Sequence, residues 1–174
     1  MATGQILRGR SNMPLFGKNG TLLYSTVVSM QVDITISWGG GQDVDICGCY
    51  NTVPGEVGWN HADEIDQDGF FAHWDGDNTT GGPEYVHLEY SGGRASLLGV
   101  CFDVHTNWYR VGGEEGEDQG DGGSCTVTAT DSKGTTKSYT FTPAQSHGRA
   151  ASAGDPGVRI NFNINGTIKS ITPC

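Results

Sequence analysis

The chain has few basic residues and none of the short motifs that mark common enzyme classes. Its 174 residues include 10 Lys and Arg against 20 Asp and Glu, a formal net charge of −10. Such a chain disfavours binding to nucleic acid, because that affinity comes largely from Lys and Arg on phosphates. Gly-x-Ser-x-Gly, phosphate-loop and HExxH motifs are all absent from the sequence, so we expect a protein that is not an enzyme.

The sequence also lacks an apolar run long enough to span a bilayer, and it opens without the apolar core of a signal peptide. We therefore expect synthesis in the cytoplasm without membrane insertion. The final location would be the cytoplasm, or a virion or other extracellular assembly. No CxxC pair occurs among the five cysteines, which are Cys47, Cys49, Cys101, Cys125 and Cys174. In a reducing compartment we expect free thiols that pack as small apolar side chains.

No segment shows the 3.6-residue period of an amphipathic helix. Instead, 28 glycines separate short segments in which apolar and polar residues alternate. The clearest strand is 30–38, and Asn165-Gly166 lies between two alternating runs as a hairpin turn. Further strands are expected at 43–50, 70–74, 84–90, 97–104, 125–130, 137–142, 158–164 and 167–171. The pattern predicts an all-β fold, an antiparallel β-sandwich of about eight or more short strands with an extended N-terminal arm.

Residues 1–20 differ from the rest of the chain, because they contain three basic residues and no acidic one. We interpret 1–20 as an arm and 21–174 as the β-sandwich domain. A basic arm with apolar anchors could dock on an acidic neighbouring copy, which predicts a homo-oligomer or a larger protein assembly. The alternative is an arm that folds onto its own sandwich. The predicted contact residues are Ile6, Arg8, Arg10, Leu15 and Phe16.

Two clusters of oxygen-bearing side chains suggest a metal site. Asp43 and Asp45 lie on one face of an expected strand, because strand side chains alternate with period two. Asp75, Asp77 and Asn78 occupy a Gly-flanked turn. Hard oxygen ligands of this kind suit Ca²⁺, which takes six to eight of them. The alternative is a pair of solvated acidic segments without an ion.

A second calcium motif overlaps the first. Glu64, Asp66, Asp68, Gly69 and Asp75 stand at positions one, three, five, six and twelve of an EF-hand loop. The match is imperfect, since Glu comes first and Asp last, and no flanking helices are expected. Asp66, Asp68 and Asp75 could still add oxygen atoms to the main site.

The order of these segments resembles the tellurium-resistance TerD family of calcium-binding β-sandwiches. The resemblance covers about residues 27–110: an apolar strand ending in Trp38, then 43–46, then the turn 76–81 leading into a strand. It implies calcium ligands at Asp43, Asp45, Asp77 and Asn78, with Glu84 as a further one. Gly82-Pro83 shortens a stretch that is longer and acidic in the family, which leaves the number of ions open.

The sequence thus predicts a non-enzymatic calcium-binding protein with a structural or assembly role, such as a virion or filament component. A cytoplasmic stress-response protein of the TerD type is the first alternative. A calcium-dependent carbohydrate-binding or adhesion module is the second, because the four tryptophans could line a sugar platform.

Overall fold

The computed structural model describes residues 4–6, 18–19, 24–39, 43–79, 81–109, 123–145 and 149–174. Over these ranges the chain forms β-strands, with one short 3₁₀ turn, η1 (Arg94–Leu97), as the helical element. The predicted all-β sandwich is therefore confirmed. In the same ranges, no helix has the length and apolar character needed to cross a membrane.

The first sheet is antiparallel and is built around the longest strand, β2 (Tyr24–Trp38). Its order is β10-β9-β2-β7-β6-β5, and β1 (Gly4–Ile6) pairs with β2 outside this path. The other bounds are β5 (Glu64–Gln67), β6 (Phe70–Trp74), β7 (Glu84–Gly93), β9 (Cys125–Asp131) and β10 (Thr136–Phe141).

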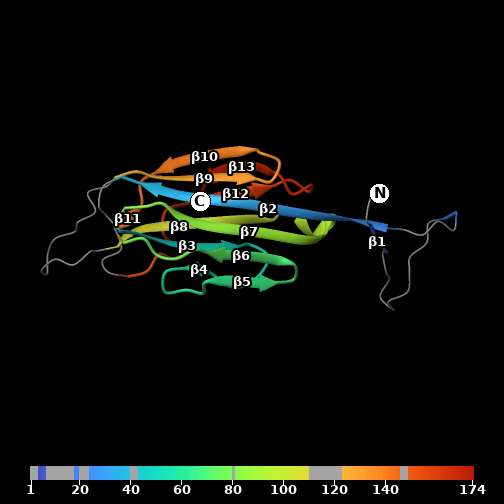
Figure 1. Cartoon of the computed structure of the whole chain (residues 1–174), viewed down its shortest axis with the longest axis horizontal. Coiled ribbons are helices and arrows are strands. Elements are labelled where there is room, and N and C mark those ends of the chain that lie inside the picture. Colours follow the sequence, from blue (N-terminus) through green and yellow to red (C-terminus); the bar gives the residue numbers. More distant parts are fainter. Residues whose placement is uncertain are drawn as a thin grey trace, which may run out of the picture.

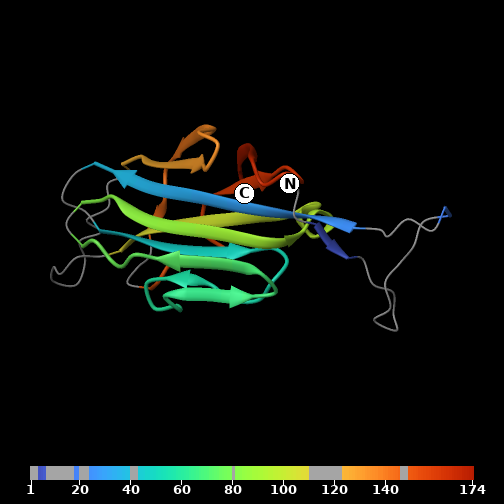
Figure 2. The ribbon, with the colours of Figure 1, turned by 45° about the vertical axis from the view of Figure 1, so that its right-hand side comes forward.

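The second sheet faces the first and has the order β13-β12-β8-β3-β4. Its strands are β3 (Asp43–Tyr50), β4 (Val57–Gly58), β8 (Cys101–Tyr109), β12 (Gly157–Phe162) and β13 (Ile168–Pro173). All pairs on this path are antiparallel, and the short β11 (Ala144–Gln145) adds a parallel pair to β8. Figures 1 and 2 show the strands of both sheets running along the long axis of the molecule.

The core fills the space between the two sheets, as the alternating pattern predicts. Four side chains of β2 are at most 1% exposed: Met30, Val32, Ile34 and Ile36. The residues between them are exposed or half-buried. These side chains join those of β7, β8, β9 and β12 in one apolar cluster. Removal of this apolar surface from water is the main force that holds the two layers together.

The apolar run at 97–104 was expected to form one strand, and the structure divides it. Residues 94–97 form η1, and β8 begins only at Cys101. Gly99 adopts a φ of +75°, a left-handed conformation that a strand cannot contain, and so the run is interrupted there. From 101 to 108 every side chain is buried, as expected for a strand that is covered on both faces.

Part of the N-terminal arm pairs with its own chain. The backbone of Gly4–Ile6 forms an antiparallel ladder with residues 24–26, at the end of β2 that projects beyond the sandwich (Figure 1). Of the predicted contact residues, Arg8, Arg10, Leu15 and Phe16 lie outside the described residues, as does the side chain of Ile6. The predicted contact between subunits therefore stays a prediction.

The Asn165-Gly166 turn between β12 and β13 packs closely against β2, and glycine variants can test this contact. Gly166 has a φ of +79°, and a Cβ there would lie 2.7 Å from the Ser29 carbonyl oxygen. Gly134, in the turn after β9, has a φ of +84° but open space around the Cβ position. Gly134→Ala should therefore cost only the left-handed strain, about 1–2 kcal/mol.

Gly166→Ala should cost clearly more, since the new methyl group must also displace backbone. Urea denaturation of the two variants measures the difference. Equal losses in the free energy of unfolding would show that the close approach at Ser29 does not constrain the fold.

Candidate metal centre

Three aspartates from the two sheets meet at one end of the sandwich. Asp43 and Asp45 are the first and third residues of β3 and therefore share one face of that strand. They are 4% and 1% exposed. Asp77 lies in the loop that joins β6 to β7 in the opposite sheet. One carboxylate oxygen from each of the three lies within 4.8 Å of the other two, so the cluster bridges the layers.

Glu84, the first residue of β7, adds a fourth carboxylate and is 2% exposed. The indole Nε1 of Trp74 donates a hydrogen bond to Glu84 Oε2 at 2.9 Å, and the backbone N–H of Asn78 donates to Oε1 at 3.2 Å. The Asp77 carboxyl group is hydrogen-bonded to Glu84 as well. Glu84 thus ties the loop carrying Asp77 to the buried end of β6.

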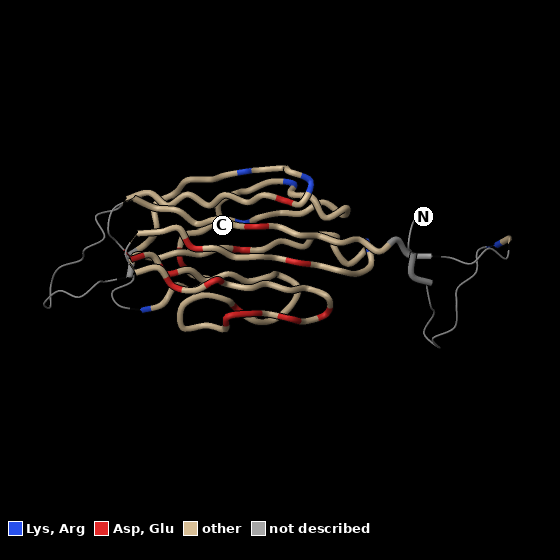
Figure 3. Tube along the Cα trace, viewed as in Figure 1, with Lys and Arg blue, Asp and Glu red and all other residues tan. Residues whose placement is uncertain are grey.

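The cluster carries negative charge without a basic partner. Asp43 Oδ1 and Asp45 Oδ2 are buried and find no hydrogen-bond partner. Across the described ranges, no Lys or Arg forms an ion pair with these aspartates, since Arg149 and Arg159 bind Asp155 and Asp103. Figure 3 shows acidic residues at the left end of the body, where β3 begins and the chain leaves β6, and others along the strands and the lower hairpin. Unpaired buried charges of this kind are costly, so the site needs protons or a cation.

The pKa values of the four carboxyl groups show the same need. Burial, followed by the charge of Asp77, raises the pKa of Asp43 to about 6. Burial, followed by the nearby acids, raises the pKa of Asp45 to about 8. Burial also raises the pKa of Glu84 to about 7 and raises that of Asp77. Near neutral pH the metal-free cluster therefore retains protons that a bound cation would displace.

The structure does not bring every predicted ligand to this cluster. Residues 64–75 form a hairpin of β5 and β6 rather than an EF-hand loop, with Asp68 and Gly69 in its turn. Asp66 and Asp68 are exposed, and the turn lies at the other end of β6 from Asp77, about 17 Å along a five-residue strand. Asp75 is exposed and contacts His73 Nε2 at 3.5 Å.

Asn78 makes its hydrogen bonds within the β6–β7 loop: its backbone N–H donates to Glu84, and its side-chain amide donates to the Pro83 carbonyl at 3.5 Å. It therefore serves the loop that carries Asp77.

Asn107 is a candidate ligand that sequence reasoning missed. It lies directly opposite Asp45 in the β3–β8 ladder, where Cβ atoms are about 4.5–5.5 Å apart. Its amide nitrogen donates to the Arg149 carbonyl and to Asp155 Oδ2, both at 3.3 Å. Its Oδ1 is buried without a partner. No local signal points to Asn107, since its proximity to Asp45 depends on strand register across 60 residues.

The donor atoms of the cluster are all oxygens, which suits Mg²⁺, Ca²⁺ or Mn²⁺ and disfavours soft metals. No family model, curated protein or solved structure matches the chain. The resemblance to the TerD family therefore depends on the short motifs at 43–46 and 76–81, and it stays a hypothesis.

The raised pKa values predict an unusual pH dependence for the metal-free chain. Carboxyl groups of an unfolded chain lose their protons near pH about 4, whereas those of the folded cluster keep theirs to between about pH 6 and 8. In this window the folded state therefore binds more protons than the unfolded state. The free energy of unfolding should therefore fall as pH rises through this window. Urea denaturation in chelator at pH 5 and at pH 8 measures this fall.

Burial lowers the pKa of His87, but its hydrogen bonds to Asp33 and Glu89 raise it by more, so the pKa lies above its ordinary value. His87 therefore also makes the free energy of unfolding fall as pH rises. Asp45→Asn separates the contribution of the cluster from that of His87, because it removes the titration of Asp45 and leaves His87 unchanged. The pH profile of the free energy of unfolding should then fall less steeply. The exposed Asp66→Asn variant should leave the profile unchanged. A wild-type chain that is as stable at pH 8 as at pH 5 would contradict the prediction.

Proposed function

We propose that this chain is a non-enzymatic Ca²⁺-binding β-sandwich in which the ion has a structural role. The observation that carries the proposal is the meeting of Asp43, Asp45 and Asp77 from two sheets, with two buried carboxylate oxygens that lack any partner. A divalent cation would satisfy both oxygens and remove the repulsion among the acids.

The ligand set favours Ca²⁺ over Mg²⁺. Asp43, Asp45 and Asp77 would supply carboxylate oxygens, Asn107 Oδ1 a neutral oxygen, and water the remainder. Ca²⁺ accepts six to eight oxygens in an adaptable shell, whereas Mg²⁺ demands a near-ideal octahedron. Ligands drawn from two strands and a loop are more readily accommodated by the adaptable shell.

A structural role in an assembly is the second part of the proposal. An ion that joins β3 to the β6–β7 loop rigidifies one end of the sandwich, as a virion or filament component requires. At the other end, β2 projects beyond the body and carries β1 (Figure 2). The basic residues of the arm would then contact the acidic body of a neighbouring copy.

Calcium should raise the thermal stability of the chain, because a ligand that binds only the folded state stabilises it by RT ln(1 + [L]/Kd). At a hundredfold excess over Kd this is about 2.7 kcal/mol. Calorimetric melting with calcium and with chelator measures the shift, and parallel runs with magnesium test the choice of ion. Asp77→Ala should abolish the difference, whereas Asp75→Ala, which changes an exposed neighbour outside the cluster, should retain it.

Superimposable wild-type melting curves in calcium and chelator would refute the site. A shift that Asp75→Ala abolishes and Asp77→Ala keeps would place the ion in the exposed turn instead.

The assembly role predicts that the arm holds copies together. Deletion of residues 1–18 should dissolve any oligomer seen by light scattering and leave the calcium-dependent melting intact. Arg8→Glu combined with Arg10→Glu should weaken the oligomer while keeping the length of the arm, and added salt should weaken the wild-type oligomer too. An oligomer unaffected by the deletion would exclude the arm as connector, and a wild-type chain that is monomeric throughout would favour the TerD-type cytoplasmic alternative.

A further inference from the structure

β3 continues from the aspartate cluster into a second group of metal-ligating side chains with different chemistry. Alternation places Cys47 on the same face as Asp45, two residues further along the strand. The sequence shows no partner for this cysteine, but the fold supplies two. Cys47, Glu56 and His61 each offer a ligand atom within 4.8 Å of the other two.

The tight turn around β4 brings these partners to Cys47. Glu56 precedes β4 and His61 follows it, and β4 pairs with Cys47 and Gly48. Gly58 has a φ of +135°, and a Cβ there would lie 2.0 Å from the Ile46 carbonyl oxygen, so only glycine permits this close approach. The backbone of the turn is closed by hydrogen bonds from His61 N to Gly58 O and from Ala62 N to Glu56 O.

The ring of His61 makes one contact through each nitrogen, an arrangement that metal-bound histidines share. Its Nε2 lies 2.9 Å from the Ala151 carbonyl oxygen, and because a carbonyl only accepts, Nε2 carries the hydrogen. In a neutral imidazole Nδ1 is then a lone pair, and it faces Glu56 Oε2 at 3.2 Å. Two acceptors at this distance need a proton or a cation between them. Metal-bound histidines characteristically donate their other N–H to a carbonyl or carboxylate in this way.

The segment that carries the Ala151 carbonyl is itself fixed. Ala151 is fully buried, and Asp155 accepts hydrogen bonds from the Ser152 backbone at 2.9 Å and from the Arg149 guanidinium. The imidazole is therefore held in place by a rigid neighbour rather than by a free loop.

The separation of Glu56 and His61 fits a tetrahedral zinc ion. Two ligands at about 2.0–2.1 Å from zinc, at the tetrahedral angle, lie about 3.3 Å apart, close to the Glu56–His61 separation of 3.2 Å. One thiolate, one imidazole and one carboxylate suit Zn²⁺ and exclude Ca²⁺, which takes oxygen ligands. Three protein ligands leave one coordination position open.

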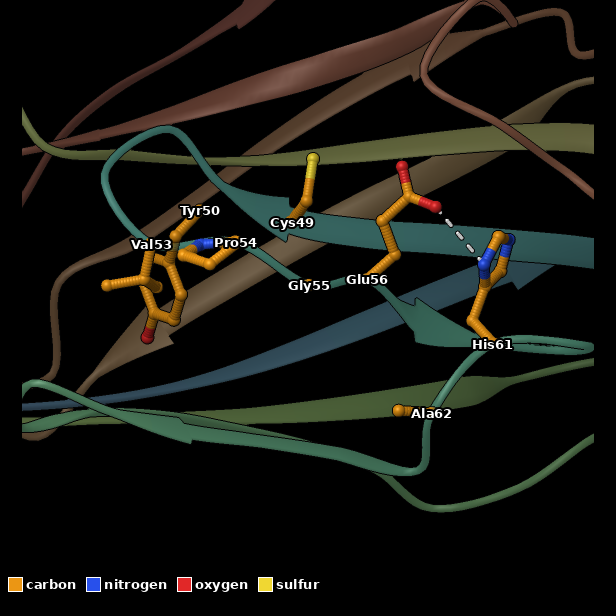
Figure 4. Close-up of a pocket in the computed structure, with 8 residues that line it drawn as sticks. All are labelled: Cys49, Tyr50, Val53, Pro54, Gly55, Glu56, His61 and Ala62. Carbon is orange, nitrogen blue, oxygen red and sulfur yellow. Dashed lines mark ion pairs between the residues drawn. The ribbon is translucent and has the colours of Figure 1, made fainter.

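Two of the three proposed ligands, Glu56 and His61, line a pocket. The cavity has a volume of about 470 Å³ and is lined in part by Cys49, Tyr50, Val53, Glu56 and His61. Figure 4 shows Glu56 and His61 pointing toward each other beside it, with Cys49 nearby on β3. The side chains of Glu56 and His61 are partly exposed, so an ion between them could carry a water molecule from the pocket.

A comparable group elsewhere on the same sheet is less suited to a metal. Asp103, His105 and Cys174 also lie within 4.8 Å of one another. Asp103, however, accepts two hydrogen bonds from the Arg159 guanidinium, both at 2.8 Å, so its charge is already compensated. His105 donates through Nδ1 to a backbone carbonyl, as His61 does through Nε2, so the paired carboxylate is the feature that makes this group less suited to a cation.

We propose that Cys47, Glu56 and His61 bind one Zn²⁺ with a solvent-accessible fourth position, at a site separate from the proposed calcium centre. The metal-free full-length chain should bind one Zn²⁺ in the presence of excess Ca²⁺, measured by titration calorimetry. Co²⁺ in place of Zn²⁺ should give the thiolate-to-metal absorption band and the visible bands of a tetrahedral site.

Cys47→Ser should remove the thiolate band, and Glu56→Gln and His61→Gln should each weaken zinc binding by more than about 100-fold, the upper range for loss of a mere supporting residue. Glu56 and His61 lie near the surface, so these two variants keep the test valid if Cys47→Ser fails to fold. Cys174→Ser is the matched control and should leave both the band and the affinity unchanged. Asp45→Asn should abolish the calcium response and spare zinc binding, which separates the two proposals.

Failure of the wild-type chain to bind zinc would overturn the inference. A band that survives Cys47→Ser and disappears in Cys174→Ser would overturn it too, by assigning the metal to the second group. If Cys49→Ser lowers the affinity as much as Cys47→Ser does, Cys49 is the fourth ligand and the claim of an open position is wrong.

Discussion

The structure depends on how it manages buried negative charge where its two sheets meet. Asp43, Asp45 and Glu84 are almost fully buried, yet their neighbours are other acids, a tryptophan N–H and a backbone amide. Each of these carboxyl groups is costly to keep ionised without a partner, because a charge removed from water costs several kcal/mol even after relaxation. The metal-free fold therefore keeps protons on these groups near neutral pH, and a cation in their place would join β3 to the β6–β7 loop by direct attraction.

Strand β3 supplies ligands to both proposed sites, and strand geometry explains why they differ. The inward-facing residues of β3 are apolar or small, whereas Asp43, Asp45 and Cys47 alternate with them on the opposite face. Near its start, β3 is close to the β6–β7 loop, which brings oxygen atoms. Four residues later it is paired with β4, which brings a carboxylate and an imidazole. The neighbouring segment, rather than the strand itself, sets which metal each position can bind.

Local pattern was enough to predict the long strands and one half of the candidate site. The strands at 43–50 and 70–74 have the predicted bounds, since turn-forming residues lie close to their ends, namely Gly41, Asn51, Gly69 and Asp75. β2, by contrast, begins at Tyr24, six residues before the predicted start. β4 and β11 have two residues each, and β5 has one buried apolar residue, Ile65, so they carry no periodic signal. The shared face of Asp43 and Asp45 follows from period two alone. Their distance to Asp77, and the roles of Asn107 and His61, depend on which strands become neighbours.

The contrast between Asp68 and Asp77 shows how topology decides which acids can act together. Both lie in turns that flank β6, and the sequence makes both candidate ligands, Asp77 through the main motif and Asp68 through the imperfect EF-hand match. Asp68 closes the hairpin between two neighbouring strands of one sheet and is exposed to water. Asp77 lies in the longer connection from β6 to β7, long enough to reach across to the start of β3 in the other sheet. Among the described residues, an acidic turn therefore becomes a candidate metal site where its loop reaches the other layer, because there the exposed Asp77 meets Asp43 and Asp45, which are buried on a distant strand.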